Sequence, residues 1–255
     1  MRTGSLVQSV AIIFGGLMLT TAPTMAQGVS VYTQKDTAAE TAAAPAEDAE
    51  ATKPFEIDVT LAAVSDYRFR GISLSDKDPA FQPSITVTHE SGLYASVWGS
   101  NIADNGGADI EVDLVGGFNK EFGPVSFGIN ATYYLYPGAA STNYIEFIST
   151  LGTEVGPGSI GLTVAYAPKQ DNIGDEDSVY VAINGSLPIG GTPLTLVGSF
   201  GIEDGAFGDA KRDWSAGVNA DVAGFTVGLS YIDTARTGGD SLGKATAVLS
   251  VSKSF

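Results

Sequence analysis

The sequence predicts an all-β protein, an antiparallel transmembrane β-barrel of about twelve strands that follows a signal peptide and a disordered linker. Three observations lead to this fold. Apolar and polar residues alternate with a period of two from Phe55 onward, long and short connections alternate along the chain, and the last residue, Phe255, is aromatic. A period of two is typical of strands, and regular alternation of connection length is typical of membrane barrels.

The composition excludes several classes of protein. Charged residues make up 16% of the 255 residues, against roughly 25% in soluble domains, and the net charge is −16. Such an acidic chain lacks the clustered Lys and Arg of a nucleic-acid binder. The absence of Cys excludes disulfides and thiolate metal sites, and a single His argues against His-based relays and metal centres. We therefore expect no catalytic residue, no metal and no cofactor.

The first 54 residues are predicted to lie outside the barrel. Residues 1–26 have the features of a secretory signal peptide: Arg2, an apolar run from Val10 to Leu19, and small residues at Thr24 and Ala26. The alternative, a membrane anchor, needs about 20 apolar residues, and this run is shorter. Residues 27–54 form an Ala- and Glu-rich linker that is expected to be disordered in the periplasm, because it has little to bury.

The barrel is expected to span residues 55–255. In its first strand, apolar Ile57, Val59 and Leu61 alternate with polar Asp58 and Thr60. The alternation is weak at 93–100 and 144–154, so it does not fix which way those two strands face. The predicted strands are 55–71, 81–89, 93–100, 110–120, 125–136, 144–154, 160–167, 178–187, 194–202, 214–222, 225–233 and 244–255.

The connections favour a membrane barrel over a soluble sandwich. Long connections at 72–80, 101–109, 137–143, 168–177, 203–213 and 234–243 alternate with short ones that contain Gly or Pro. A β-sandwich shows the same polar and apolar faces but has no reason to collect its long connections at one end. We expect the long loops to face outward and the short turns and both termini to face the periplasm.

Aromatic residues on the apolar faces suggest girdles at the two lipid interfaces. They are Tyr67, Phe69, Phe81, Phe118, Phe122, Tyr166, Phe200, Trp214, Phe225, Tyr231 and Phe255. Phe255 closes an amphipathic strand and is similar to the outer-membrane assembly signal, although Lys253 departs from that pattern. The expected partners are outer-membrane lipid and lipopolysaccharide, the barrel-assembly machinery through the C-terminal strand, and small solutes or ions.

One stretch resembles a known family. Residues 65–79 (SDYRFRGISLSDKDP), followed by 89–101 (HESGLYASVWGSN), resemble the TorF family of porins, a proteobacterial outer-membrane family also called Gcw_chp. The match is specific over roughly residues 55–120 and agrees elsewhere in length, strand pattern and terminal Phe. The resemblance implies a porin-like barrel, without a proven substrate or known site residues.

The candidate pore-lining residues are charged residues on the predicted inward faces. Asp66, Arg68 and Arg70 alternate with Ser65, Tyr67 and Phe69 near the outer end of the first strand; Glu111, Asp113 and Glu146 complete the set. The three first-strand residues fit either a charged constriction of a pore or an internal network of ion pairs, and both interpretations remain open.

Two other groups are poor candidates for chemistry. His89, Glu90 and Ser91 are triad types, but neighbours on a strand point to opposite faces. The acidic segment 171–177 lacks the EF-hand spacing, so a solvated loop is favoured over a divalent-cation site shared with lipopolysaccharide.

These observations predict a porin for small hydrophilic solutes or ions. Residues 55–255 hold 24 acidic and 10 basic residues, a surplus of 14 negative charges, which predicts a preference for cations. The alternatives are a closed structural or surface-recognition barrel, which predicts a bulky interior with paired charges, and an outer-membrane hydrolase.

Overall fold

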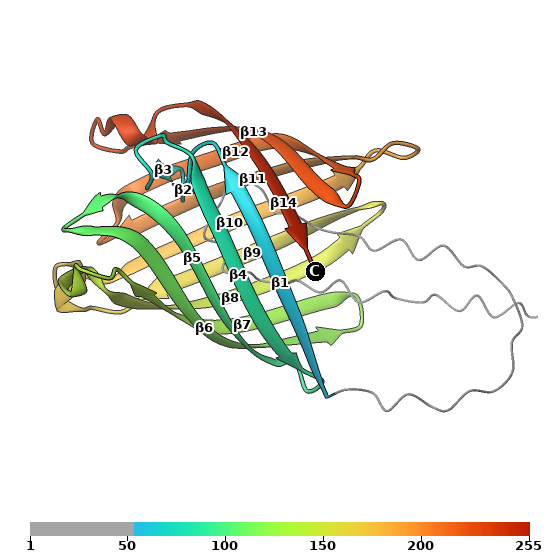
Figure 1. Ribbon diagram of the computed structural model, residues 1–255, viewed down its shortest axis with the longest axis horizontal. Coiled ribbons are helices and arrows are strands. Elements are labelled where there is room, and N and C mark those ends of the chain that lie inside the picture. The colour runs from blue at the N-terminus through green and yellow to red at the C-terminus, as the bar shows by residue number, and fades with distance from the viewer. Residues whose placement is uncertain (1–53) are drawn as a thin grey trace, which may run out of the picture.

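A computed structural model describes residues 54–255, which form a closed antiparallel barrel of twelve strands (Figure 1). The barrel strands are β1 (Phe55–Val64), β4 (Ala80–His89), β5 (Leu93–Asn105), β6 (Ala108–Phe122), β7 (Val125–Leu135), β8 (Tyr144–Val155), β9 (Gly158–Ala167), β10 (Ser178–Pro188), β11 (Leu194–Gly205), β12 (Gly208–Val222), β13 (Phe225–Ala235) and β14 (Thr246–Ser254). The strand count and the fold class are as predicted. The signal peptide and all but the last residue of the linker lie outside the described residues.

Each strand pairs with its neighbours in the chain, and β1 closes the barrel against β14 with Thr60 opposite Ser254. Three short 3₁₀ helices, Ala140–Thr142, Asp171–Ile173 and Ser241–Gly243, lie in connections at one end. None of the helices in residues 54–255 has the length and apolar character needed to cross a membrane. We call the end of the barrel that carries the three 3₁₀ helices the loop end, and the opposite end, which carries the short turns, the turn end.

The side-chain faces follow the predicted period of two. On β14, Val248, Ser250 and Ser252 are buried inside the barrel, whereas Leu249 and Val251 are exposed on its outer wall. The same alternation along the other strands leaves a wall of large apolar side chains facing outward. An apolar outer face and a polar inner face are the arrangement that a barrel needs in lipid.

Three predicted element boundaries are wrong. The first strand ends at Val64, not at residue 71, because the chain then turns into the barrel. The predicted loops 101–109 and 203–213 are largely strand: β5 and β6 meet at a turn of Gly106 and Gly107, and β11 and β12 meet at residues 206 and 207. Both glycines of the first turn have positive φ, which suits a tight hairpin.

The two halves of the interior differ in the size of their side chains. The turn-end half is lined by small polar residues, such as Thr86, Ser96, Asn130, Ser199 and Ser215. The loop-end half holds the largest fully buried side chains, which include tyrosines and ionisable groups: Arg68, Tyr67, Tyr134, Tyr180, Glu111, Glu146 and Glu203. The candidate site therefore lies in the loop-end half.

The C-terminal residue closes the seam between β1 and β14. The backbone N–H of Phe255 donates to the carbonyl of Val59 at 2.9 Å, and the N–H of Val59 donates back at 3.3 Å. The ring is exposed, and Nζ of Lys253 lies 5.0 Å from its centre and 5.0 Å from that of Phe225. Lys253 thus faces outward with its charge over two aromatic rings, which explains how a lysine is accommodated near this end.

Candidate functional site

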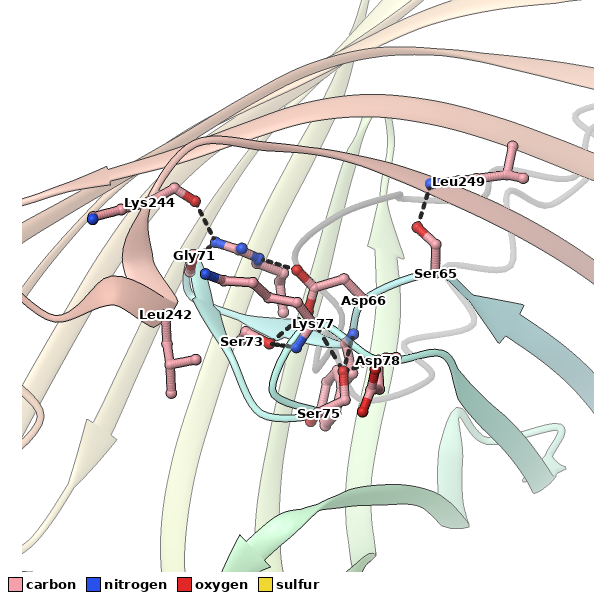
Figure 2. A network of polar contacts seen from close by, with 12 residues as sticks. Ser65, Asp66, Gly71, Ser73, Ser75, Lys77, Asp78, Leu242, Lys244 and Leu249 are labelled. Atoms are coloured by element: carbon pink, nitrogen blue, oxygen red, sulfur yellow. Dashed lines mark hydrogen bonds and ion pairs between the residues drawn. The ribbon is translucent and has the colours of Figure 1, made fainter.

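Residues 65–79 leave the barrel wall and fold into the interior; we call this segment the inward loop (Figure 2). Ser65 is its last contact with β14: its N–H donates to the carbonyl of Leu249 at 2.8 Å, and its Oγ accepts from the N–H of Leu249 at 2.9 Å. Beyond it, β2 (Arg68–Phe69) and β3 (Ile72–Ser73) form a small hairpin. The inward loop therefore occupies the space enclosed by the strands.

The turn of this hairpin depends on Gly71. Its φ is +82°, and a Cβ at this position would lie 2.0 Å from Oγ1 of Thr234 and 2.9 Å from Cβ of Asp213. Only glycine combines a positive φ with such a close approach to neighbouring side chains. Arg70, with a φ of +47°, is also in the left-handed region, which brings strain to a residue with a side chain.

Asp66 organises the hydrogen bonds within the inward loop (Figure 2). Its Oδ2 accepts from Nε of Arg68 at 2.7 Å, and its Oδ1 accepts from Oγ of Ser73 at 2.6 Å. Arg68 also donates from Nη1 to the carbonyl oxygens of Gly71 and Lys244, at 2.9 and 3.0 Å. Both charged side chains are buried, so the loop carries its own neutral ion pair into the interior.

Arg70 connects the inward loop to the opposite wall of the barrel. Its Nη2 lies 2.6 Å from Oε2 of Glu146 on β8, and its Nη1 lies 2.5 Å from Oε1 of Glu203 on β11. The guanidinium carbon is 4.6 Å from the ring centre of Phe69 and 4.4 Å from that of Tyr180. The guanidinium group is therefore held by two carboxylates and two aromatic rings. The exposed fraction of the Arg70 side chain is only 3%.

Aromatic packing fills the space around the inward loop. Tyr67 packs on Trp98 with ring centres 5.4 Å apart, and Phe69 meets Tyr134 edge-on at 6.0 Å. Tyr134 stacks on Tyr144 at 4.3 Å. Tyr67 and Phe69 were predicted to face lipid, and this prediction is wrong, because the chain leaves the barrel wall before it reaches them.

The buried interior of the described chain has more acidic than basic groups. Six carboxylates and three basic side chains are buried there: Asp66, Glu111, Asp113, Glu146, Glu203 and Asp213, with Arg68, Arg70 and Lys211. The ion pairs among residues 54–255 join Asp66 to Arg68, Glu146 and Glu203 to Arg70, and Glu203 to Lys211. Glu111, Asp113 and Asp213 belong to none of them, so the site has a surplus of acidic groups.

The remaining carboxylates have few hydrogen-bond partners. Glu111 accepts from the hydroxyl of Tyr136 at 3.3 Å, and Asp213 accepts from the hydroxyl of Tyr180 at 3.2 Å. Asp113 is fully buried, and both of its carboxylate oxygens lack a hydrogen-bond partner among the described residues. A buried carboxylate without a partner is costly as an anion, so this part of the site favours an added positive charge or a proton.

The charges of the inward loop depend on this environment. Burial by itself lowers the pKa of Arg70, but Glu146 and Glu203 outweigh it and raise the pKa well above its ordinary value. Burial, with the nearby carboxylates of Glu111 and Asp113, raises the pKa of the Tyr67 hydroxyl. Arg70 therefore stays charged and Tyr67 stays neutral over the physiological pH range.

The structure brings the predicted pore-lining residues into one region, by a route that differs from the prediction. Glu111, Asp113 and Glu146 lie on the inner faces of β6 and β8. Asp66, Arg68 and Arg70 lie inside as well, but on the inward loop and not on the first strand. Their contacts form an internal network of ion pairs, which is one of the two interpretations left open above. Their role in lining a pore remains a prediction.

Sequence reasoning missed three charged residues of the site. Glu203, Lys211 and Asp213 fall in a segment that was assigned to a loop, although β11 and β12 extend through them. The available signal was the alternation itself: outward Phe200 and Ile202 flank Gly201, and Glu203 follows in the inward register. Gly201 also matters for packing, because a Cβ there would lie 2.1 Å from the Tyr180 hydroxyl.

The other candidate groups lie apart from this site. Oγ of Ser91 is 2.8 Å from Nδ1 of His89 in the exposed turn at the turn end, so these two side chains, which are two positions apart, do meet. No carboxylate among residues 54–255 is hydrogen-bonded to this ring, so the pair lacks the third member of a triad. The acidic segment 171–177 is an exposed connection that begins with a 3₁₀ helix.

Comparisons with known proteins agree with this architecture. The model of a family described as "Bacterial protein of unknown function (Gcw_chp)" matches residues 48–255. No curated protein matches the chain in sequence. Among solved structures, the barrel is similar to the KdgM porin, with a TM-score of 0.53 and 12% identity over 78% of this chain and 98% of that one.

Two further solved structures are similar. The NanC porin has a TM-score of 0.51 and 9% identity, over 77% of this chain and 98% of that one. The COG4313 outer membrane channel from Pseudomonas putida F1 has a TM-score of 0.51 and 9% identity, over 84% and 100%. At such low identity the likeness shows the fold, which is that of bacterial outer-membrane channels, and the apolar outer wall fits a lipid bilayer.

Proposed function

Because the chain belongs to the Gcw_chp family and its barrel has the fold of outer-membrane porins, we propose that it is a porin for passive diffusion of small hydrophilic solutes or ions. In this proposal it resides in the outer membrane, contacts lipid and lipopolysaccharide, and is inserted by the barrel-assembly machinery through its C-terminal strand. That the family is the TorF porins remains a prediction. In this proposal the chain is a channel and not an enzyme; the His89–Ser91 pair lies in an exposed turn, and no carboxylate among residues 54–255 is hydrogen-bonded to it.

The observation that carries the proposal is the polar inner wall of a barrel whose outer wall is apolar. In the turn-end half, inward positions hold small polar side chains such as Asn184, Ser199 and Ser215, all only half-buried. Small polar side chains on the inner face leave room for water, as in barrels that conduct solutes. The inward loop lies at the other end, so we propose that it is the barrier that controls passage.

The proposed pore prefers cations. Its buried interior has six carboxylates against three basic groups, and residues 55–255 as a whole have a surplus of 14 negative charges. A narrow passage of one sign concentrates counter-ions and repels co-ions, and salt weakens this effect as it shortens the Debye length from about 10 Å at 0.1 M to about 3 Å at 1 M.

The second candidate is a closed barrel with a structural or surface-recognition function that its loops carry out. The observation in its favour is the filling of the loop-end half, where Arg70, Glu146 and Glu203 form buried ion pairs next to stacked tyrosines. This interior is bulkier and better paired than the sequence suggested. A permanently closed barrel and a gated pore differ in one respect: only the pore conducts when the contacts of the inward loop are broken.

Planar-bilayer recordings on the purified full chain test both candidates. We expect brief conductance steps for the natural protein and longer or larger ones for the Arg70→Ala variant. In a potassium chloride gradient, the reversal potential should indicate a preference for cations at low salt. It should approach zero at high salt, where the selectivity is lost. Absence of conductance in both proteins would overturn the porin proposal and favour the closed barrel. An anion preference would overturn the proposed selectivity alone.

A further inference from the structure

The side chain of Arg70 occupies a site that the barrel wall builds from its own residues. Glu146 on β8 and Glu203 on β11 each bind one guanidinium nitrogen, and the ring of Tyr180 on β10 lies 4.4 Å from the guanidinium carbon. All three belong to barrel strands, and only Phe69 comes from the inward loop. We propose that these wall residues form a binding site for organic cations that bear a guanidinium group, and that Arg70 fills it as an internal substitute while the inward loop is in place. This inference rests on the proposed porin function and names the solute class.

The geometry matches a planar group with several donors. Two separate carboxylates are reached by two different nitrogens of the same guanidinium, at 2.6 and 2.5 Å. A guanidinium has five N–H donors in a fixed plane, whereas the three donors of an ammonium share one nitrogen and cannot offer two separate nitrogens to two acceptors. The flanking ring of Tyr180 adds a cation–π contact, which favours an organic cation with exposed π-faces.

Charge balance indicates that the site needs a cation when the inward loop is absent. The loop takes Asp66 and Arg68 with it as a neutral pair, because they bind each other. Without Arg70, the wall keeps five buried carboxylates and one basic group: Glu111, Asp113, Glu146, Glu203 and Asp213, with Lys211. Withdrawal of the loop therefore leaves a negative wall whose natural occupant is a positively charged solute.

Unused acceptors within the site point to the same class of ligand. Oε1 of Glu146 and Oδ2 of Asp213 are buried without a hydrogen-bond partner among the described residues. A free guanidinium compound has N–H groups to spare for such acceptors. A metal ion is a poorer fit, because no three acidic or His side chains in residues 54–255 are grouped so that they can hold one.

Chemical rescue tests this site. Arg70→Ala, made in the full chain and purified in detergent, removes the internal guanidinium and leaves the wall intact. We expect N-ethylguanidinium to raise the Tm of this variant saturably, and ethylammonium at equal ionic strength to bind about tenfold more weakly or less, because it loses one of two charge-assisted hydrogen bonds. The natural protein should show no saturable rise, since Arg70 fills the site.

Two controls make the rescue specific. Arg212→Ala removes an arginine that is exposed on β12 and should show no response to N-ethylguanidinium. The triple variant Arg70→Ala, Glu146→Gln, Glu203→Gln lacks both carboxylates and should also show none. Equal rises with ethylammonium, or a rise in the triple variant, would overturn the site. If Arg70→Ala does not assemble, Arg70→Ser is used in its place, because it adds a small polar group without filling the space of the guanidinium.

Bilayer recordings separate this inference from the porin proposal. In Arg70→Ala channels, N-ethylguanidinium should reduce the potassium current at concentrations about tenfold below those at which ethylammonium does so. Conductance without selective block and without rescue overturns the site but leaves the porin. Rescue of Tm in a protein that never conducts supports the site and overturns the porin.

Discussion

Arg70 and Glu146 are 76 positions apart in the chain, yet Nη2 of the arginine lies 2.6 Å from Oε2 of the glutamate inside the barrel. This contact joins the inward loop to β8, and a second one joins it to Glu203 on β11. Both strands lie across the barrel from β1, from which the loop departs. The charge of one residue thus holds the loop-end half of the interior in a single arrangement.

Loss of this charge should destabilise the barrel. Arg70→Ala leaves Glu146 buried without its ion partner, and breaking a buried pair on one side costs about 3–5 kcal/mol. Urea unfolding of the purified protein measures the change in the free energy of unfolding. Arg70→Lys should recover only part of it, because one ammonium cannot serve both carboxylates well. A loss below about 1 kcal/mol for the alanine variant would show that the network adds little to stability.

The turn of the inward loop should not tolerate a side chain at residue 71. Gly71→Ala combines a positive φ with a Cβ 2.0 Å from Oγ1 of Thr234, so we expect a loss of more than about 1 kcal/mol. Gly190→Ala is the matched control, because nothing lies within 4 Å of its Cβ position, and it should change stability by less than about 0.5 kcal/mol. Equal stability of both variants would mean that the hairpin turn is easily rebuilt.

Two buried aspartates should respond in opposite ways to loss of charge. Asp66→Asn removes the negative charge beside Arg68 and leaves a single acceptor oxygen for the two donors, Arg68 and Ser73, so it should cost about 3–5 kcal/mol. Asp113→Asn removes a carboxylate without partners, so unfolding free energy should stay equal or rise. Thermal unfolding of both variants at neutral pH checks this contrast. A large loss from Asp113→Asn would reveal a cation bound to that carboxylate.

Removal of Phe255 should impair insertion into the outer membrane. The deletion removes two backbone hydrogen bonds to Val59 at the seam and the exposed ring beside Lys253. Phe255→Ala keeps the backbone bonds and removes only the ring, so it separates seam closure from recognition by the assembly machinery. Heat-modifiable barrel in membrane fractions is the measurement. Normal amounts for the deletion would argue against both roles.

The orientation can be read by cysteine labelling, since the chain has no cysteine of its own. Glu176→Cys lies in an exposed connection at the loop end, and Gly190→Cys lies in an exposed turn at the turn end. In intact cells, a membrane-impermeant maleimide should label the first and not the second. The reverse result would mean that the loop end faces the periplasm.

Strand faces were predictable from sequence because the immediate surroundings of each position, outside or inside the barrel, determine whether its residue is apolar or polar. On β6, Ile110 and Leu114 face outward and Glu111 and Asp113 face inward, as the period of two predicts. The weak alternation of polar and apolar residues at 93–100 also has a simple explanation. Its inward positions include Tyr94 and Trp98, whose large side chains pack within the barrel and mask the polar face.

The inward loop was not predictable from the same pattern. The alternation of Tyr67 and Phe69 with Arg68 and Arg70 continues that of β1, so local sequence gives no sign that the wall ends at Val64. What bends the chain inward is a set of distant partners, Leu249 for Ser65 and the carboxylates of β8 and β11 for Arg70. Hydrophobic periodicity carries no information about contacts between residues that are so far apart in the sequence.

The contacts between the inward loop and the last part of the chain set an order of events in folding. Ser65 binds Leu249, and Arg68 binds the carbonyl of Lys244, 176 positions later. Neighbouring strands can pair one after another while the chain is still open, but these partners meet the loop only when β14 joins β1. Closure of the cylinder must therefore precede or accompany the final docking of residues 65–79. In a nascent barrel whose last strand is missing, the inward loop would lack these contacts and would keep those of Arg70 with Glu146 and Glu203.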